Sequence, residues 1–138
     1  MAPDVLLRKL TFLRQVLADL APYEKATVAQ VRADHYKIER IFELLVVAAT
    51  DIIGHKLAER QIVPDSYRQA FSLAAEQGWL PLDLAERLQE AAGMRNLIAH
   101  MYERIEYPIL QQSIKPALRD FEQFVALFAT EIDDEDAL

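Results

Sequence analysis

Residues 38–53 read IERIFELLVVAATDII, an apolar stretch interrupted at helical intervals by polar side chains. Its apolar residues recur three or four positions apart, as one face of an α-helix requires. The members of this face are Ile38, Ile41, Phe42, Leu45, Ala49, Ile52 and Ile53. A face this broad suits a helix in the middle of a bundle, so the stretch predicts an all-α protein built around it.

Capping residues, prolines and one glycine divide the rest of the chain into helices. Capping boxes are expected at Thr27 with Gln30 and at Ser66 with Gln69. The other signals are Pro22 after the first helix, Gly78 after the short helix, Pro81 and Pro108 at helix starts, and Pro116 as a kink. The predicted helices cover about residues 5–20, 27–60 with a break near Asp34, 66–77, 81–102 and 108–132. They predict one domain, residues 1–130, folded as an up-and-down bundle of four to five helices.

The composition excludes several classes of protein. The 138 residues include no cysteine, which excludes disulfide scaffolds, thiol nucleophiles and cysteine-based zinc sites. The longest apolar run, Leu44–Ala49, is too short to cross a bilayer, and Met1–Leu10 lacks the pattern of a secretory signal. The three histidines do not have the mutual spacing of a metal site. We therefore expect a cytoplasmic protein with no metal, no cofactor and no membrane contact.

The formal charge of −7 is concentrated at the carboxyl end. Five acidic residues between Glu131 and Asp136 leave only −2 for the rest of the chain. Residues 131–138 are expected to form an acidic, disordered tail. The body shows no basic stripe, which counts modestly against tight, phosphate-driven binding of RNA.

Residues 94–102, MRNLIAHMY, are the stretch whose polar side chains are best suited to chemistry. On a helical wheel of these residues, the methionines, Leu97 and Ile98 share one stripe, which places Arg95 and His100 away from it. Arg95 and His100 are five residues apart and diverge about an ideal helix axis. A frayed helix end, a long arginine stem or a second copy of the chain could bring them to one substrate, so a dimer-built site is the first expectation.

In spacing, this stretch resembles the HepT toxins of the HEPN superfamily of helical ribonucleases. Their motif is Arg, four residues, His, one residue, Tyr, and it matches Arg95, His100 and Tyr102 without departure. The length, the helical pattern and residues 39–45 leading to Asp51 are also similar to that family. The resemblance implies a HEPN-like fold and a ribonuclease toxin of a type VII toxin–antitoxin module. It also implies a partner, an MntA-like nucleotidyltransferase antitoxin that transfers AMP to the tyrosine, here Tyr102.

Metal-independent RNA cleavage needs a base for the ribose 2′-hydroxyl and a cation for the phosphate charge. His100 suits the first task because the ordinary pKa of histidine is near neutrality. Arg95 suits the second because a guanidinium donates two parallel hydrogen bonds while it stays charged. Asn96 is placed to orient His100 or to bind a phosphate oxygen. The sequence therefore predicts catalysis by Arg95 and His100 in a homodimer, or a higher hetero-oligomer, acting on RNA.

Other readings stay open. The chain could be a non-catalytic helical dimerisation or binding module that partners a nucleotidyltransferase, or a plain structural bundle. Asp51 and His55, four residues apart, could form a catalytic dyad, although a solvated helix pair is the more common arrangement. His35 and Tyr36 near a helix start are given no function.

Overall fold

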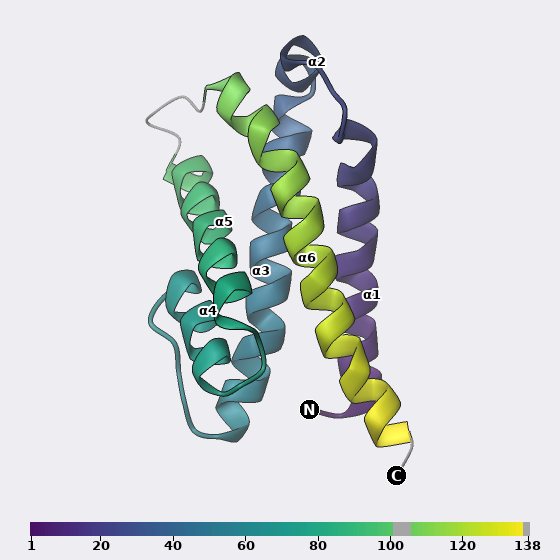
Figure 1. Ribbon diagram of the computed structural model, residues 1–138, viewed down its shortest axis with the longest axis vertical. Coiled ribbons are helices and arrows are strands. Elements are labelled where there is room, and N and C mark those ends of the chain that lie inside the picture. The colour runs from purple at the N-terminus through teal and green to yellow at the C-terminus, as the bar shows by residue number, and fades with distance from the viewer. Residues whose placement is uncertain (101–105, 137–138) are drawn as a thin grey trace.

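Four long helices that alternate in direction form the molecule. The computed structural model describes residues 1–100 and 106–136, with side chains for 1–98 and 106–132. The long helices are α1 (Pro3–Leu20), α3 (His35–Glu59), α5 (Leu82–His100) and α6 (Tyr107–Asp136). α1 and α5 run upward in Figure 1, and α3 and α6 run downward. The predicted up-and-down helical bundle is confirmed.

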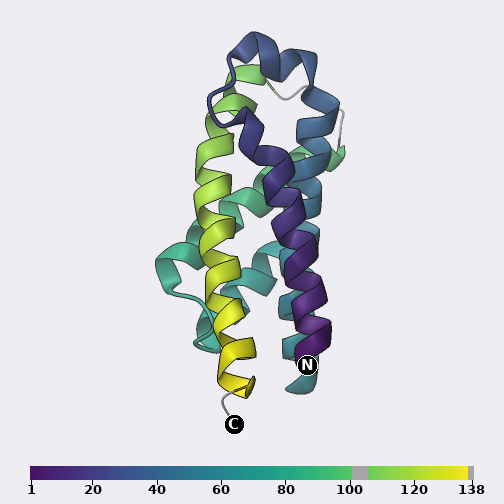
Figure 2. The same ribbon diagram turned by 90° about the vertical axis from the view of Figure 1, so that its right-hand side faces the viewer.

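Three short elements complete the described part of the chain. A 3-10 turn, η1 (Ala21–Tyr23), follows α1; α2 (Val28–Ala33) closes one end of the bundle; and α4 (Tyr67–Glu76) lies beside α5. Figure 2 shows α1 and α6 side by side on the face of the bundle away from α4. The bundle thus has a compact half made by α1, α3 and α6, and a second half in which α4 and α5 lie against α3.

The apolar face of residues 38–53 lies at the centre of the bundle, as its pattern predicted. Phe42, Leu45 and Ile53 are almost completely buried on α3. The other large buried side chains come mainly from α1, α4 and α6, and include Leu10, Leu13, Leu20, Phe71, Phe121, Phe124 and Phe128. Burial of each such side chain contributes about 1.5–3 kcal/mol, so this shared core holds the helices together.

A buried carboxylate joins α5 to α6. Asp120 on α6 is 4% exposed, and its Oδ1 accepts hydrogen bonds from Arg87 Nε at 2.9 Å and Arg119 Nε at 3.0 Å. Arg87 also binds Asp83 one turn earlier on α5, at 3.2 Å. Two guanidinium groups therefore compensate the buried charge, as burial of a carboxylate requires.

Most helix boundaries follow the expected signals. Thr27 and Gln30 form the predicted capping box of α2, and the break near Asp34 separates α2 from α3. Ser66 caps α4, but the Gln69 side chain accepts from the amide of Asp65 instead of that of Ser66, so only half of the predicted box forms. α4 ends at Glu76, and Gly78 follows it with a φ of 82°.

Three boundaries differ from the prediction. α5 begins at Leu82, because Pro81 serves as the residue before the helix and its carbonyl accepts from the Ala85 amide at 3.0 Å. α6 begins at Tyr107 and includes Pro116 in its interior. It also continues to Asp136, into the segment expected to be disordered. Glu131 binds Lys56 of α3 at 2.5 Å, which fixes the beginning of that segment to the bundle.

Candidate active site

Arg95 lies on the buried side of α5. Leu84, Leu88 and Ala92 are fully buried at helical spacing, and Arg95 continues their stripe three residues after Ala92. Only 20% of the Arg95 side chain is exposed, whereas Leu97 is 41% exposed. The wheel of residues 94–102 was right for Ile98, which is 5% exposed, and wrong for Arg95 and Leu97. It failed for these two because the longer stripe from Leu84 sets the orientation of α5.

The guanidinium of Arg95 is held by residues from two other helices. Its central carbon lies 4.7 Å from the centroid of the Tyr67 ring, at the start of α4, in cation–π contact. Its Nη2 lies 4.0 Å from Glu43 Oε1 on α3, and its Nη1 donates to Asn96 Oδ1 at 3.4 Å. α3, α4 and α5 therefore meet around this one side chain.

The charge of Arg95 is only partly compensated. Glu43 also binds Arg40 at 3.2 Å, which is shorter than its contact with Arg95. Arg95 Nε is buried and has no hydrogen-bond partner among the described residues. An unpaired buried donor costs about 1–3 kcal/mol. The terminal nitrogens make only long contacts, 3.4 Å to Asn96 and 4.0 Å to Glu43. The arrangement is that of a cation with donor capacity left for an anion.

The other motif residues are placed to different extents. Asn96 is partly buried and lies beside the cavity described below. The backbone of His100 forms the last residue of α5, but its side chain lies outside the described residues. Tyr102 also lies outside them. Arg95 and Asn96 are thus located, and the convergence of His100 and Tyr102 with them stays a prediction.

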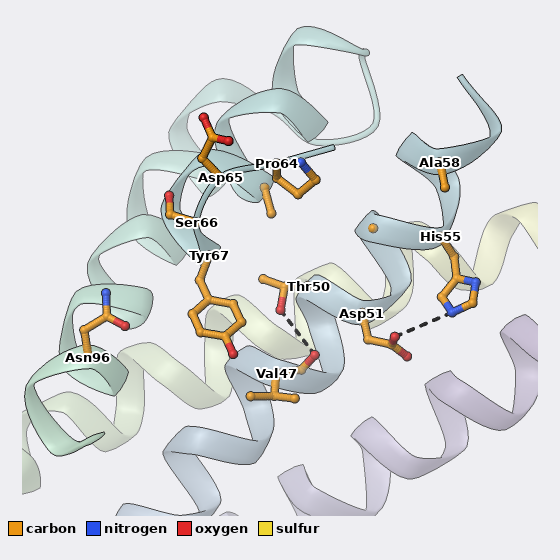
Figure 3. A pocket seen from close by; sticks show the side chains of 12 residues that line it. Val47, Thr50, Asp51, His55, Ala58, Pro64, Asp65, Ser66, Tyr67 and Asn96 are labelled. Carbon is orange, nitrogen blue, oxygen red and sulfur yellow. Dashed lines mark hydrogen bonds and ion pairs between the residues drawn. The ribbon is translucent and has the colours of Figure 1, made fainter. Parts of the chain in front are cut away.

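A cavity of about 710 Å³ lies next to Asn96. One wall is α3, from Val47 to Ala58, and the other is the turn before α4 together with Tyr67 and Ala70. Figure 3 shows the Tyr67 side chain between Asn96 on one side and α3 on the other. Its volume is within the range of small-molecule sites in proteins. Tyr67 contributes both to this cavity and to the support of Arg95.

Asp51 and His55 form a partly exposed pair on the far side of the cavity (Figure 3). Asp51 Oδ1 lies 3.6 Å from His55 Nε2, and both side chains are about half exposed. Asp51 Oδ2 also binds Lys9 of α1. Because the carboxylate is shared with an ammonium and is open to water, this geometry fits a solvated helix pair better than a catalytic dyad.

The remaining histidine has a local partner. His35 Nδ1 lies 2.8 Å from Glu39 Oε2, and its ring lies 5.3 Å from that of Tyr107 on α6. This cluster joins the starts of α3 and α6. In residues 1–98 and 106–132, no group of three or more potential ligands is arranged to hold a metal ion. None of the described helices is long and apolar enough to cross a membrane.

Sequence reasoning missed two residues of the site, Tyr67 and Glu43. Tyr67 follows the helix cap Ser66, and the sequence gives no sign that its ring faces a residue 28 positions later on α5. Glu43 is one of several acidic residues at the edge of the apolar face of α3. The useful signal would have been the α5 stripe, which points Arg95 toward α3 and α4.

Comparisons with known proteins support the fold. A family model described as ribonuclease HepT-like matches residues 6–128. The mRNA nuclease HepT of Shewanella oneidensis is 31% identical over 85 residues, which are 61% of this chain and 64% of that protein. The match therefore spans slightly less than two thirds of that relative.

Solved structures with the same fold are also found. One is a tri-AMPylated Shewanella oneidensis HEPN toxin in complex with an MNT antitoxin, with a TM-score of 0.83 and 22% identity over 94% of this chain and 99% of that one. Another is a toxin–antitoxin complex with AMP-PNP, with a TM-score of 0.82 and 21% identity over 92% and 98% of the two chains. At these identities the likeness shows a shared fold.

Proposed function

Since the chain belongs to the ribonuclease HepT-like family, we propose that it is a metal-independent endoribonuclease toxin that an antitoxin inactivates by AMP transfer. The observation that carries the proposal is Arg95, a largely buried guanidinium five residues before His100 on the same helix. Its Nε has no partner among the described residues, and its terminal nitrogens make only long contacts. A cation with spare donors and a histidine are the two groups that cleavage by the ribose 2′-hydroxyl requires.

In the proposed reaction, His100 takes the proton of the 2′-hydroxyl and O2′ attacks the adjacent phosphorus. The bond from phosphorus to O5′ breaks, which leaves a 2′,3′-cyclic phosphate and a 5′-hydroxyl after O5′ takes up a proton. Arg95 donates to the non-bridging oxygens as negative charge develops on them. Asn96, bonded to Arg95, holds the guanidinium in place or donates to the same phosphate.

A homodimer is part of the proposal. Arg95 and His100 diverge along α5, and a second copy would supply a second histidine to protonate O5′. A groove of about 510 Å³ between α1 and α3 supports this assembly. Phe12 and Val47 line it and are 45% and 37% exposed. This groove offers an apolar surface against which a second chain can pack.

The proposed control acts on Tyr102. A nucleotidyltransferase antitoxin would bring ATP to it, and the tyrosine oxygen would attack the α-phosphorus. Pyrophosphate would leave, and an AMP ester would remain. Its phosphate would compete with RNA for Arg95, and its nucleoside would fill the site. The HEPN toxin in the similar complex carries three AMP groups.

The experiment that tests this function is induction of the chain alone in growing bacteria, beside His100→Ala and Arg95→Ala at matched expression. The parent is expected to arrest growth, and both variants are expected to be harmless. The purified parent should cut RNA to products with 2′,3′-cyclic phosphate ends. If parent and variants are equally harmless and no RNA is cut, the chain is a non-catalytic binding module instead.

A further inference from the structure

The cavity beside Asn96 has an apolar floor and a polar rim. Gly54 and Ala58 of α3 are among its apolar lining residues, together with Pro64 and Ala70. The rim carries the carboxylates of Asp51 and Asp65 with the side chains of His55, Ser66 and Asn96. Figure 3 shows Asp65 and Ser66 at one end of the cavity and Asn96 beyond Tyr67. A flat, largely apolar group with polar edges fits this lining.

Gly54 is the residue that the fold itself does not explain. It lies in the interior of α3, where glycine costs about 1 kcal/mol relative to alanine. A Cβ built there would meet no atom of another part of the described structure within 4 Å, and its backbone does not have a positive φ. Neither packing against the described residues nor backbone conformation requires glycine, so the open space above it is the feature that a larger side chain would remove.

The carboxylates at the rim make the cavity unfavourable for phosphate, Asp65 more than Asp51, which Lys9 already binds. Asp51 and Asp65 are acceptors only, and Asp65 makes no ion pair with any residue of the described part. A phosphate there would be repelled, whereas Arg95 beyond Tyr67 attracts one. RNA recognised as a single strand is bound in this divided way, with unstacked bases in pockets and the backbone on cations.

We propose that this cavity receives one unstacked base of the RNA strand next to the phosphate that Arg95 binds. The inference rests on the ribonuclease function proposed above and names a specificity site within it. Asn96 and Tyr67 link the two parts, because each lines the cavity and each contacts Arg95. One nucleotide can therefore place its base in the cavity and its phosphate at the guanidinium.

The acidic rim also predicts which bases are preferred. Guanine, adenine and cytosine present an amino group on the Watson–Crick edge, and guanine adds an imino donor beside it. Uracil presents one imino donor between two carbonyl oxygens, which carboxylates repel. Because Asp51 and Asp65 only accept hydrogen bonds, the cavity should bind bases with an amino group more tightly than uracil.

The test uses single-stranded pentaribonucleotides with 2′-O-methyl groups throughout, so that the attacking hydroxyl is blocked. The central position carries adenine, cytosine, guanine, uracil or no base, and affinities are measured by fluorescence anisotropy at one low salt concentration. The full chain should bind the best base-bearing strand about tenfold more tightly than the abasic strand, as a base held in a protein pocket typically contributes. Uracil should be the weakest of the four bases.

Variants at two positions make the test specific. Gly54→Leu fills the space above α3 and should lower binding of every base-bearing strand to the abasic level. Gly54→Ala, the matched control, raises helix propensity, adds one methyl and should keep most of the preference. Asp65→Asn, at an exposed turn position where misfolding is not expected, introduces a donor and should raise the relative affinity for uracil.

Three results would overturn the inference. If parent protein cuts RNA but binds abasic and base-bearing strands equally, the base site is absent and the ribonuclease function stands. If no strand is bound and no RNA is cut, both proposals fail. If Gly54→Leu changes the molecular mass measured by light scattering, the space above Gly54 is occupied by another chain and not by a base.

Discussion

The guanidinium of Arg95 rests on the ring of Tyr67, 4.7 Å from its centroid, so the motif arginine of α5 is supported by the first residue of α4. An aromatic face attracts a cation without forming hydrogen bonds with it, so it uses none of the donors of the guanidinium. Arg95 can thereby be held in position while it keeps part of its terminal donors for a substrate.

Replacement of Tyr67 tests whether this support matters. Tyr67→Leu removes the ring and should lower kcat for RNA cleavage about tenfold, because the guanidinium loses its fixed orientation. Tyr67→Phe keeps the ring and should retain activity. In an Arg95→Ala background, Tyr67→Leu should have little further effect. A full tenfold loss in that background would show that Tyr67 acts independently of Arg95.

The donor geometry of Arg95 can be separated from its charge. Arg95→Lys keeps a positive charge but replaces the planar fork by a single ammonium, and it should lower kcat by about 10²–10³-fold, as loss of an oriented donor to a developing anion does. Binding of uncleavable RNA should fall much less. The two are compared by single-turnover cleavage and by anisotropy with 2′-O-methyl RNA. Equal losses in both would mean that Arg95 contributes only to binding.

How far the sequence could predict the structure depends on the range of the contacts involved. The apolar face of α3 and the cap at Thr27 are local patterns, and both are observed as expected. The orientation of Arg95 was predicted wrongly from nine residues, because the side that α5 buries is set by Leu84 and Leu88, two or more turns earlier.

The site partners of Arg95 could not be predicted from local patterns. Tyr67 reaches Arg95 only because the turn after α3 reverses the chain and sets the start of α4 against α5. The extension of α6 to Asp136 was not predicted, for a different reason. The charge-rich surroundings of that residue favour disorder in isolation, but α6 is already helical and fixed to α3 by Glu131 and Lys56, so the helix continues into them.

The turn after α3 contains a residue whose backbone conformation suits glycine. Gln61 has a φ of 60°, and the amide of Ile62 donates to the carbonyl of Leu57 at 3.0 Å, which is the helix-ending arrangement that glycine favours. Gln61→Gly should raise the free energy of unfolding by about 0.5–1 kcal/mol. Gly78→Ala, at the equivalent position after α4, should lower it by a similar amount. Chemical denaturation measures both, and a loss of stability in Gln61→Gly would contradict the prediction.

The pair of Asp83 and Arg87 on α5 predicts a pH dependence. The hydrogen bond from Arg87, with that from the Leu84 amide, lowers the pKa of the Asp83 carboxyl below its ordinary value. A carboxyl with a lowered pKa in the folded state stabilises the protein above its unfolded pKa, and this contribution is lost as the pH falls through the folded pKa. Parent and Asp83→Asn should therefore differ in unfolding free energy at pH 7 and converge in acid. A difference that grows in acid would contradict the assignment.

The proposed control by AMP transfer depends on a single hydroxyl, that of Tyr102. Tyr102→Phe removes the oxygen that would attack ATP while it keeps the ring, so the variant should stay toxic when the antitoxin is present. The parent co-expressed with a nucleotidyltransferase antitoxin should gain the mass of AMP on the peptide containing Tyr102, and the variant should not. Tyr107→Phe is a matched control, because Tyr107 lies five residues later, at the start of α6, and should leave modification and rescue unchanged. Rescue of Tyr102→Phe by the antitoxin, with no AMP on any peptide, would mean that the antitoxin neutralises the toxin by binding alone.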